Sequence, residues 1–283
     1  MQQVLPRNSI DRGYSKVARE KGETAVASLM KVGIVGVGHV GGEAALNMAL
    51  RDSCREPGDK AGRLRLLETN DPIFRDVVPK VIAAAPDAVL LVATNPLDPM
   101  TELTQRLASG KAILGTGTFL DSLRFKTALA DYLNVAPECV SALVLGEHGL
   151  SSVLLWSKVT IGGVSLESYL AGRGIEERAF RKSVEEYVRQ GNINVIKGKG
   201  VSEFAIGTVI ARVVEIILRD ECMVIPVSAY SQKYEVTLSL PRRVGRRGVL
   251  NEFEIEVNKE EQEGIGNSVE ALKVAMKRLD RSQ

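Results

Sequence analysis

KVGIVGVGHVG, residues 31–41, joins a short apolar run to a glycine-rich turn. Val32 to Val35 have the composition of a buried strand, and the turn leads into a predicted helix from Gly42 to Leu50. The turn has the spacing G-x-G-x-x-G, which lets the backbone approach a pyrophosphate at a helix N-terminus. Between a strand and a helix, this spacing favours a dinucleotide site over a purely structural turn.

The following residues alternate between predicted strands and helices. We predict a helix from Asp71 to Ala84 and buried strands over Val89–Ala93 and Ala112–Leu114. Alternation of this kind predicts a parallel sheet that is covered on both faces. A dinucleotide site also needs a second strand that ends in an acid about twenty residues after the glycines. Asp52 stands near that position, but no apolar strand precedes it, so we interpret it as a helix-end residue.

The C-terminal half has the pattern of a second region that mixes strands and helices. Its predicted strands are 153–156, 159–161, 223–228 and 236–240, and its predicted helices are 180–190, 202–218 and 259–279. We divide the chain into an extension of unknown role (1–29), a shortened dinucleotide-binding domain (30–117) and a catalytic or substrate domain (118–283).

Composition narrows the possible functions. Thirty-seven basic and thirty-five acidic residues give a formal charge of +2, which does not indicate nucleic-acid or membrane partners. A local cluster, Arg242, Arg243, Arg246 and Arg247, is expected at a solvated hairpin tip. The three cysteines lack the paired spacing of a zinc site or a disulfide framework, which fits a cytoplasmic protein without a metal. No apolar run reaches the length of a membrane span.

His148 is one of only two histidines in the chain, and the other, His39, lies in the glycine-rich turn. Because histidine alone has an ordinary pKa near neutrality, His148 is the candidate general acid. Asn95 follows the predicted strand 89–93, where side chains face the ligand crevice of such sheets. Asp121 and Arg124 share one helical face; they form either a surface salt bridge or a pair in which the carboxylate orients an imidazole and the guanidinium grips a substrate carboxylate.

Five ordered motifs give a specific resemblance to a known family. Together they strongly resemble the NAD-dependent L-lactate/malate dehydrogenase family, closest to its lactate-dehydrogenase-like branch, from Met30 to the C-terminal helix. The motifs are Gly36-x-Gly38-x-x-Gly41, Thr94-Asn95-Pro96-Leu97-Asp98, Gly115 to Phe125, Gly146-Glu147-His148-Gly149 with Trp156, and Ile196 to Gly200. The resemblance implies a shortened Rossmann-like parallel sheet followed by an α+β C-terminal domain.

The resemblance also implies catalytic roles. His148 would donate a proton to the keto oxygen while hydride reaches the adjacent carbon, and Asp121 would hold the imidazole and raise its pKa. Arg63, on a loop expected to be mobile, would polarise the carbonyl when the loop closes. Arg124 would bind the substrate carboxylate, and Asn95 would contact both the nicotinamide side and the carbonyl.

Further residues would line the pocket for a small 2-hydroxy or 2-keto acid. Ser202 matches a hydroxyl residue of this pocket, and Arg55 falls where the family chooses between lactate-like and dicarboxylate substrates, if Pro57-Gly58 aligns with the family's proline-glycine pair. NAD would be held by Gly36, Gly38, Val40, Gly41, Thr94 and Asn95. The family resemblance further implies a homodimer or homotetramer.

This sequence departs from the family pattern in two places. Leu150 stands where the family has an aspartate after His-Gly. About two β-α units, of about thirty residues each, are missing before the expected loop. Because those strands would cradle the adenosine, we expect NAD affinity to be weak or lost.

Three functions are open at this point. The first is an active 2-hydroxyacid dehydrogenase of the lactate type, with malate dehydrogenase as the alternative if Arg55 faces the substrate. The second is a catalytically impaired relative that acts as an oligomerising subunit. The third, an NAD-dependent glycosidase of related fold, would need a metal-binding Cys/His set, and no histidine lies near the cysteines in the sequence.

Overall fold

The fold is described from a computed structural model, which describes residues 31–34, 62–199 and 203–281. The chain divides into two compact units, Met1–Gly33 and Ile34–Gln283, and all the helices and strands below belong to the second. Several predicted features lie outside the described residues: the extension 1–29, the glycine-rich turn 36–41, Arg55 and Ser202.

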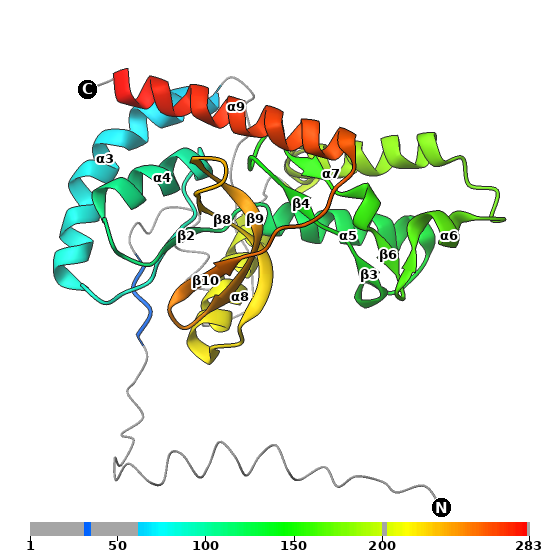
Figure 1. The fold of residues 1–283 in the computed structure, drawn as a ribbon, viewed down its shortest axis with the longest axis horizontal. Helices are drawn as coiled ribbons and strands as arrows, with labels where there is room; N and C mark the ends of the chain where they lie inside the picture. Colours follow the sequence, from blue (N-terminus) through cyan, green and yellow to red (C-terminus); the bar gives the residue numbers. More distant parts are fainter. Residues whose placement is uncertain (1–30, 35–61, 200–202, 282–283) are drawn as a thin grey trace, which may run out of the picture. The chain divides into compact units, whose positions relative to one another are not determined.

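Helices and strands alternate in the first half of the second unit, and longer antiparallel strands follow in the second half (Figure 1). The helices are α3 (Gly62–Ala84), α4 (Leu97–Leu107), α5 (Phe119–Leu133), α6 (Leu166–Leu170), α7 (Glu177–Lys199), α8 (Glu203–Arg219) and α9 (Lys259–Arg281). The strands are β1 (Leu90–Val92), β2 (Ile113–Gly115), β3 (Val140–Ser141), β4 (Val144–Leu145), β5 (Val153–Leu154), β6 (Thr160–Ile161), β7 (Val164–Ser165), β8 (Met223–Ser231), β9 (Val236–Gly245) and β10 (Gly248–Glu252). Short 3-10 turns cover Pro137–Cys139 and Trp156–Lys158.

One five-stranded sheet, in the order β1-β2-β8-β9-β10, organises this unit. β1 and β2 are parallel, as predicted, and α4 connects them. β8, β9 and β10 are antiparallel, because short turns join them and a short turn can only reverse the chain. β2 pairs with β8 through Gly115 and Ser228, so strands from both halves of the chain share this sheet.

Alternating side chains let helices cover both faces of the sheet. Ile113 and Leu114 are neighbours in β2 and point to opposite faces, since successive strand residues alternate. Ile113 packs in a cluster with Met100 and Leu103 of α4, whereas Leu114 packs with Val213 of α8. The helix α9 contacts α3, α4 and β9, which closes the side that α4 covers (Figure 1).

Three local predictions need correction. Val32 to Ile34, the described part of the predicted strand 32–35, form no strand, because no described strand pairs with them. The helix predicted from Asp71 begins earlier, at Gly62, and this places Arg63 in the first turn of α3 instead of on a loop. Leu67, one turn before Asp71, is buried on the packed face of this helix, whereas Leu66 is exposed.

Arg242 is the clearest difference from the predicted basic hairpin tip. Its side chain is 1% exposed and lies within β9, whereas Arg243, Arg246 and Arg247 are exposed as expected. Arg242 donates hydrogen bonds to the backbone oxygens of Val227, Leu238 and Ala229 and to the carboxylate of Glu252. Such partners make the burial of a guanidinium tolerable.

Candidate active site

His148 lies on the loop that connects β4 to β5. The loop is anchored at Gly146, whose N–H and C=O form two 2.9 Å hydrogen bonds with the backbone of Ser239 in β9. Gly146 has a φ of +88°, and a Cβ atom at this position would overlap the side chain of Ser268 in α9. Glycine is required here for both reasons, and it fixes the path of the chain two residues before the imidazole.

Asp121 holds the imidazole of His148. Nδ1 of His148 lies 2.7 Å from Oδ2 of Asp121, and the two side chains are only 17% and 14% exposed. A carboxylate can only accept a hydrogen bond, so Nδ1 carries the proton in this contact. Nε2 is then the ring nitrogen that could exchange a proton with a substrate.

Arg124 lies one turn after Asp121 in α5, with its side chain 13% exposed. Nη1 of Arg124 is 3.4 Å from Oδ1 of Asp121, so one carboxylate contacts both the guanidinium and the imidazole. Burial lowers the pKa of Arg124, and the charge and hydrogen bond of Asp121 oppose that shift. Asp121 therefore forms the predicted salt bridge with Arg124 and also contacts the imidazole of His148.

Asp98 holds His148 from the other side, through the backbone. It lies in the first turn of α4 and is 1% exposed. Oδ2 accepts a 2.7 Å hydrogen bond from the backbone N–H of His148, and Oδ1 accepts a 2.5 Å hydrogen bond from Oγ of Ser228 in β8. Burial raises the pKa of Asp98 to about 6, against the lowering effect of these two hydrogen bonds and of the His148 charge.

Two further predicted residues lie in the connection between β1 and α4. Thr94 and Asn95 are exposed at the carboxyl end of β1, three to four residues before Asp98. The backbone oxygen of Asn95 accepts a 2.8 Å hydrogen bond from Nδ2 of Asn70 in α3. Arg63 lies about two turns before Asn70 on the same helix.

The described residues also fit part of a dinucleotide site. Exposed polar residues at the carboxyl end of a parallel strand are where ligands of doubly wound sheets bind, and Thr94 and Asn95 occupy that position. Gly36, Gly38, Val40 and Gly41, predicted to approach the pyrophosphate, lie outside the described residues. Among the described residues there is no group of three or more His, Cys, Asp or Glu side chains that could hold a metal ion.

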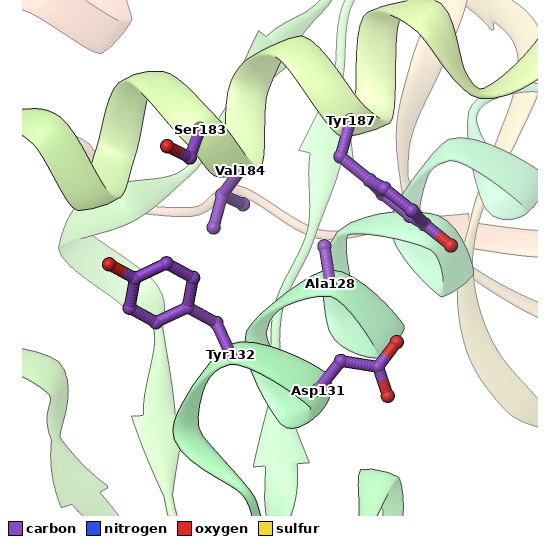
Figure 2. A pocket seen from close by; sticks show the side chains of 6 residues that line it. All are labelled: Ala128, Asp131, Tyr132, Ser183, Val184 and Tyr187. Carbon is purple, nitrogen blue, oxygen red and sulfur yellow. The ribbon is translucent and has the colours of Figure 1, made fainter. Parts of the chain in front are cut away.

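A separate hollow of about 340 Å³ lies between α5 and α7 (Figure 2). Its walls are mainly apolar. They contain neither His148 nor the residues Asp98, Asp121 and Arg124. It is lined by Ala128, Asp131, Tyr132, Ser183, Val184 and Tyr187.

Within the described part of the chain, no helix is long and apolar enough to cross a membrane.

Together, the α/β sheet with exposed polar residues at the end of β1, the carboxylate-held histidine and the neighbouring arginine fit a dehydrogenase that acts on small acids. The lactate/malate dehydrogenase NAD-binding domain matches residues 52–112, and the lactate/malate dehydrogenase alpha/beta C-terminal domain matches residues 118–282. The chain belongs to this NAD-dependent family. The membership confirms the expected fold class, the cofactor NAD and the class of hydroxyacid dehydrogenases.

Individual relatives of this chain are named L-lactate dehydrogenase. The chain is 43% identical to an L-lactate dehydrogenase of Thermus aquaticus over 235 residues, which cover 80% of this chain and 74% of the relative. It is 35% identical to an L-lactate dehydrogenase of Deinococcus radiodurans over 298 residues, with coverage of 86% and 97%. A ligand-bound crystal structure of the minor L-lactate dehydrogenase of Enterococcus mundtii superposes with a TM-score of 0.72 and 32% identity, covering 80% of this chain and 73% of the other.

The Deinococcus radiodurans alignment also bears on the missing strands. It spans 298 positions although this chain has only 283 residues, so parts of that relative have no counterpart here. Missing β-α units would leave a gap of this kind.

Sequence reasoning missed the role of Asp98, although the residue stands in the Thr94–Asp98 motif. One signal was present: Asp98 and Glu102 are acids at i and i+4 on a helix whose first two turns are otherwise apolar or hydroxyl-bearing. Both are buried, and Glu102 accepts hydrogen bonds from the backbone N–H of Thr237 and from Arg106. Acids at this spacing on a buried face require partners elsewhere in the fold.

Proposed function

We propose that this chain interconverts a small L-2-hydroxy acid and its 2-keto acid with NAD, and that lactate and pyruvate are its preferred pair. The observation that carries the proposal is the contact of Asp121 with both His148 and Arg124. Because one carboxylate contacts both groups, an imidazole and a guanidinium lie close together, and this supports their use on one small substrate. The names of the relatives from Thermus aquaticus and Deinococcus radiodurans support the choice of lactate.

NAD supplies or accepts the hydride when it is bound. In the reducing direction, protonated His148 gives the proton on Nε2 to the keto oxygen, which becomes the hydroxyl group of the product. Asp121 keeps the ring oriented through Nδ1 and stabilises its positive charge. Arg124 binds the substrate carboxylate with two parallel hydrogen bonds, which aligns the carbonyl carbon and oxygen for the two transfers.

The remaining roles follow the family pattern. Arg63 polarises the substrate carbonyl from the N-terminal end of α3, and Asn95 contacts the carbonyl and the nicotinamide side. Ser202 lines the substrate pocket, and Arg55 sets the choice between monocarboxylic and dicarboxylic acids. Gly36, Gly38, Val40, Gly41 and Thr94 hold the cofactor with Asn95.

We further propose a division into an extension (1–29), a cofactor domain (30–117) and a substrate domain (118–283). The two family matches, 52–112 and 118–282, support a boundary near residue 117. We also propose a homodimer or homotetramer in the cytoplasm. The exposed free thiols of Cys139 and Cys222 support a reducing compartment.

The direct test is NADH consumption by the full chain with pyruvate or oxaloacetate, at NADH concentrations up to millimolar. We expect faster turnover with pyruvate, and a His148→Asn variant that loses about 10²- to 10⁴-fold in kcat. Asp131→Asn is the matched control, because Asp131 is exposed on α5 and lies outside the site. Folded protein that consumes NADH with neither acid would refute the proposal, and faster turnover of oxaloacetate would assign malate. In the latter case, an Arg55→Gln variant tests whether Arg55 sets the preference.

A further inference from the structure

The loop of His148 is bound by α7 as well as by α5. Arg189 of α7 donates a hydrogen bond from Nη1 to the backbone oxygen of Leu150, at 2.9 Å, and another from Nη2 to the backbone oxygen of Ser152, at 3.3 Å. Both acceptors belong to the connection between β4 and β5 that carries His148. One guanidinium therefore spans the second half of this loop.

The contact of Arg189 with the loop uses backbone atoms. Leu150 stands where the family has an aspartate, and its side chain is 76% exposed, so Leu150 offers Arg189 a carbonyl oxygen and no carboxylate. A planar guanidinium can bind two separate oxygens at once. Because both oxygens belong to the backbone, the contact fixes the path of the chain and not the orientation of a single side chain.

The two anchored carbonyls flank a residue that closes the loop on itself. Ser151 donates hydrogen bonds from its backbone N–H, at 3.1 Å, and from Oγ, at 2.5 Å, to Oε2 of Glu147, which directly precedes His148. Oγ of Ser268 in α9 accepts from the N–H of Glu147 and donates to the backbone oxygen of Ser151. The loop is therefore one hydrogen-bonded unit, and a displacement of its second half reaches His148.

The helix α7 is a firm anchor for this unit because it packs on α5. Val188, next to Arg189, is buried in one cluster with Phe125 of α5. Phe125 directly follows Arg124, and Asp121 lies one turn earlier on the same helix. Arg189 therefore ties the loop of the imidazole to the helix pair that supplies both of its charged neighbours from α5.

We propose that Arg189 is a positioning residue, which fixes the loop of His148 on α7 so that Nε2 keeps a constant place relative to Arg124. The proposal rests on the proposed function, in which the imidazole and the guanidinium of Arg124 act on one substrate. It adds to that function a group that acts on the imidazole through the backbone of the loop.

Arg189→Gln removes the guanidinium at an exposed position, so the variant should fold. We expect kcat for pyruvate reduction to fall about tenfold, because a loop that is held less firmly spends less time in the reactive geometry. The KM for pyruvate should change by less than about twofold, since Arg124, which binds the carboxylate, keeps its own contacts on α5. Arg189→Lys should give an intermediate kcat, because an ammonium group lacks the fork that spans two oxygens.

Hydrogen exchange reports the anchoring of the loop without turnover. The backbone N–H groups of His148 and Ser151 are bound to Asp98 and Glu147, so opening of the loop makes both of them exchange. We expect both amides to exchange faster in Arg189→Gln than in the wild type, with the Tm nearly unchanged. A merely structural arginine predicts a lower Tm with an unchanged kcat, and that result would overturn the proposal.

Arg178→Gln is the matched control. Arg178 is an exposed arginine of the same helix, about three turns before Arg189. The substitution removes the same charge, and we expect kcat and the exchange of the loop amides to stay at their wild-type values. If Arg178→Gln changed them as much as Arg189→Gln does, the effect would reflect the loss of surface charge and the proposal would fail.

The two readouts separate this proposal from the proposed function. An inactive wild type whose loop amides exchange faster after Arg189→Gln would refute the proposed function alone. An active wild type in which Arg189→Gln changes neither kcat nor the exchange of these amides would refute the role of Arg189.

Discussion

Oδ2 of Asp121 accepts a hydrogen bond from Nδ1 of His148 at 2.7 Å, and both side chains are largely buried. The contact decides which ring nitrogen faces the substrate and how the ring is turned. It also places a negative charge beside the group that must become positive during proton exchange.

Asp121→Asn should lower kcat for pyruvate reduction by about 10²- to 10⁴-fold. The amide can present its NH₂ group to Nδ1, which favours the wrong tautomer, and it no longer stabilises the imidazolium. The measurement is steady-state NADH consumption against pH, with Asp131→Asn on the same helix as control. An Asp121→Asn variant with wild-type kcat would remove the carboxylate from the mechanism.

Arg124→Lys should lower kcat/KM for pyruvate by about a hundredfold, mostly through a higher KM. A lysine keeps the charge but cannot form the two parallel hydrogen bonds of a guanidinium with a carboxylate. The exposed Arg178 in α7 offers the same substitution away from the site. Equal KM values in Arg124→Lys and in the wild type would show that another group binds the carboxylate.

Gly146→Ala should destabilise the protein more than Gly163→Ala does. Both glycines have a left-handed φ, +88° and +83°, but a Cβ at Gly146 meets Ser268 whereas nothing lies within 4 Å at Gly163. The backbone strain is therefore shared, about 1 kcal/mol in each case, and the overlap is specific to Gly146. Denaturant unfolding gives the difference in the free energy of unfolding, and a similar loss in both variants would contradict the prediction. Only Gly146→Ala should also lower kcat, since it displaces the loop of His148.

Asp98 gives the stability of the protein a pH dependence of known sign. Its pKa is about 6 in the folded chain against 3.8 for an unperturbed aspartate, so the folded state holds the proton more tightly. The stabilisation is complete below pH 3.8 and is lost as the pH rises through about 6, with a loss on the order of 3 kcal/mol at neutral pH. The free energy of unfolding of the wild type minus that of Asp98→Asn should therefore decrease from pH 4 to pH 7. A difference that is constant or that increases over this range would contradict the raised pKa of Asp98 in the folded state.

NADH should bind the full chain more weakly than micromolar. The strand and acid that would hold the adenosine ribose are missing from the sequence after the glycine-rich turn, and the Deinococcus radiodurans alignment contains positions without a counterpart here. A fluorescence titration measures the dissociation constant directly. Micromolar or tighter binding would show that other residues replace the missing units.

The predictable part of the fold was local. Strands β1 and β2 and helix α9 follow directly from apolar runs and helical spacing, as does most of α8. The sequence could not predict that β2 pairs with β8, because more than a hundred residues separate Gly115 from Ser228 and no local pattern encodes such a partner. Arg242 was misplaced for the same reason, since the backbone oxygens that make its burial possible come from β8 and from its own strand.

The candidate site was predictable where a motif named both the residue and its chemistry. His148, Asp121 and Arg124 stand in two separate motifs, and the structure brings them within hydrogen-bonding distance. Asp98 also stands in a motif, but its role depends on the backbone of a loop fifty residues away. Backbone hydrogen bonds leave no signature in side-chain types, so this contact could only be found in three dimensions.

The shared sheet has a consequence for any attempt to divide the protein. Residues 118–283 produced alone would lose the pairing of Ser228 in β8 with Gly115 in β2 and expose that part of the strand edge, and unpaired strand edges promote aggregation. Truncation at the family-domain boundary should therefore yield insoluble material rather than a free substrate-binding module.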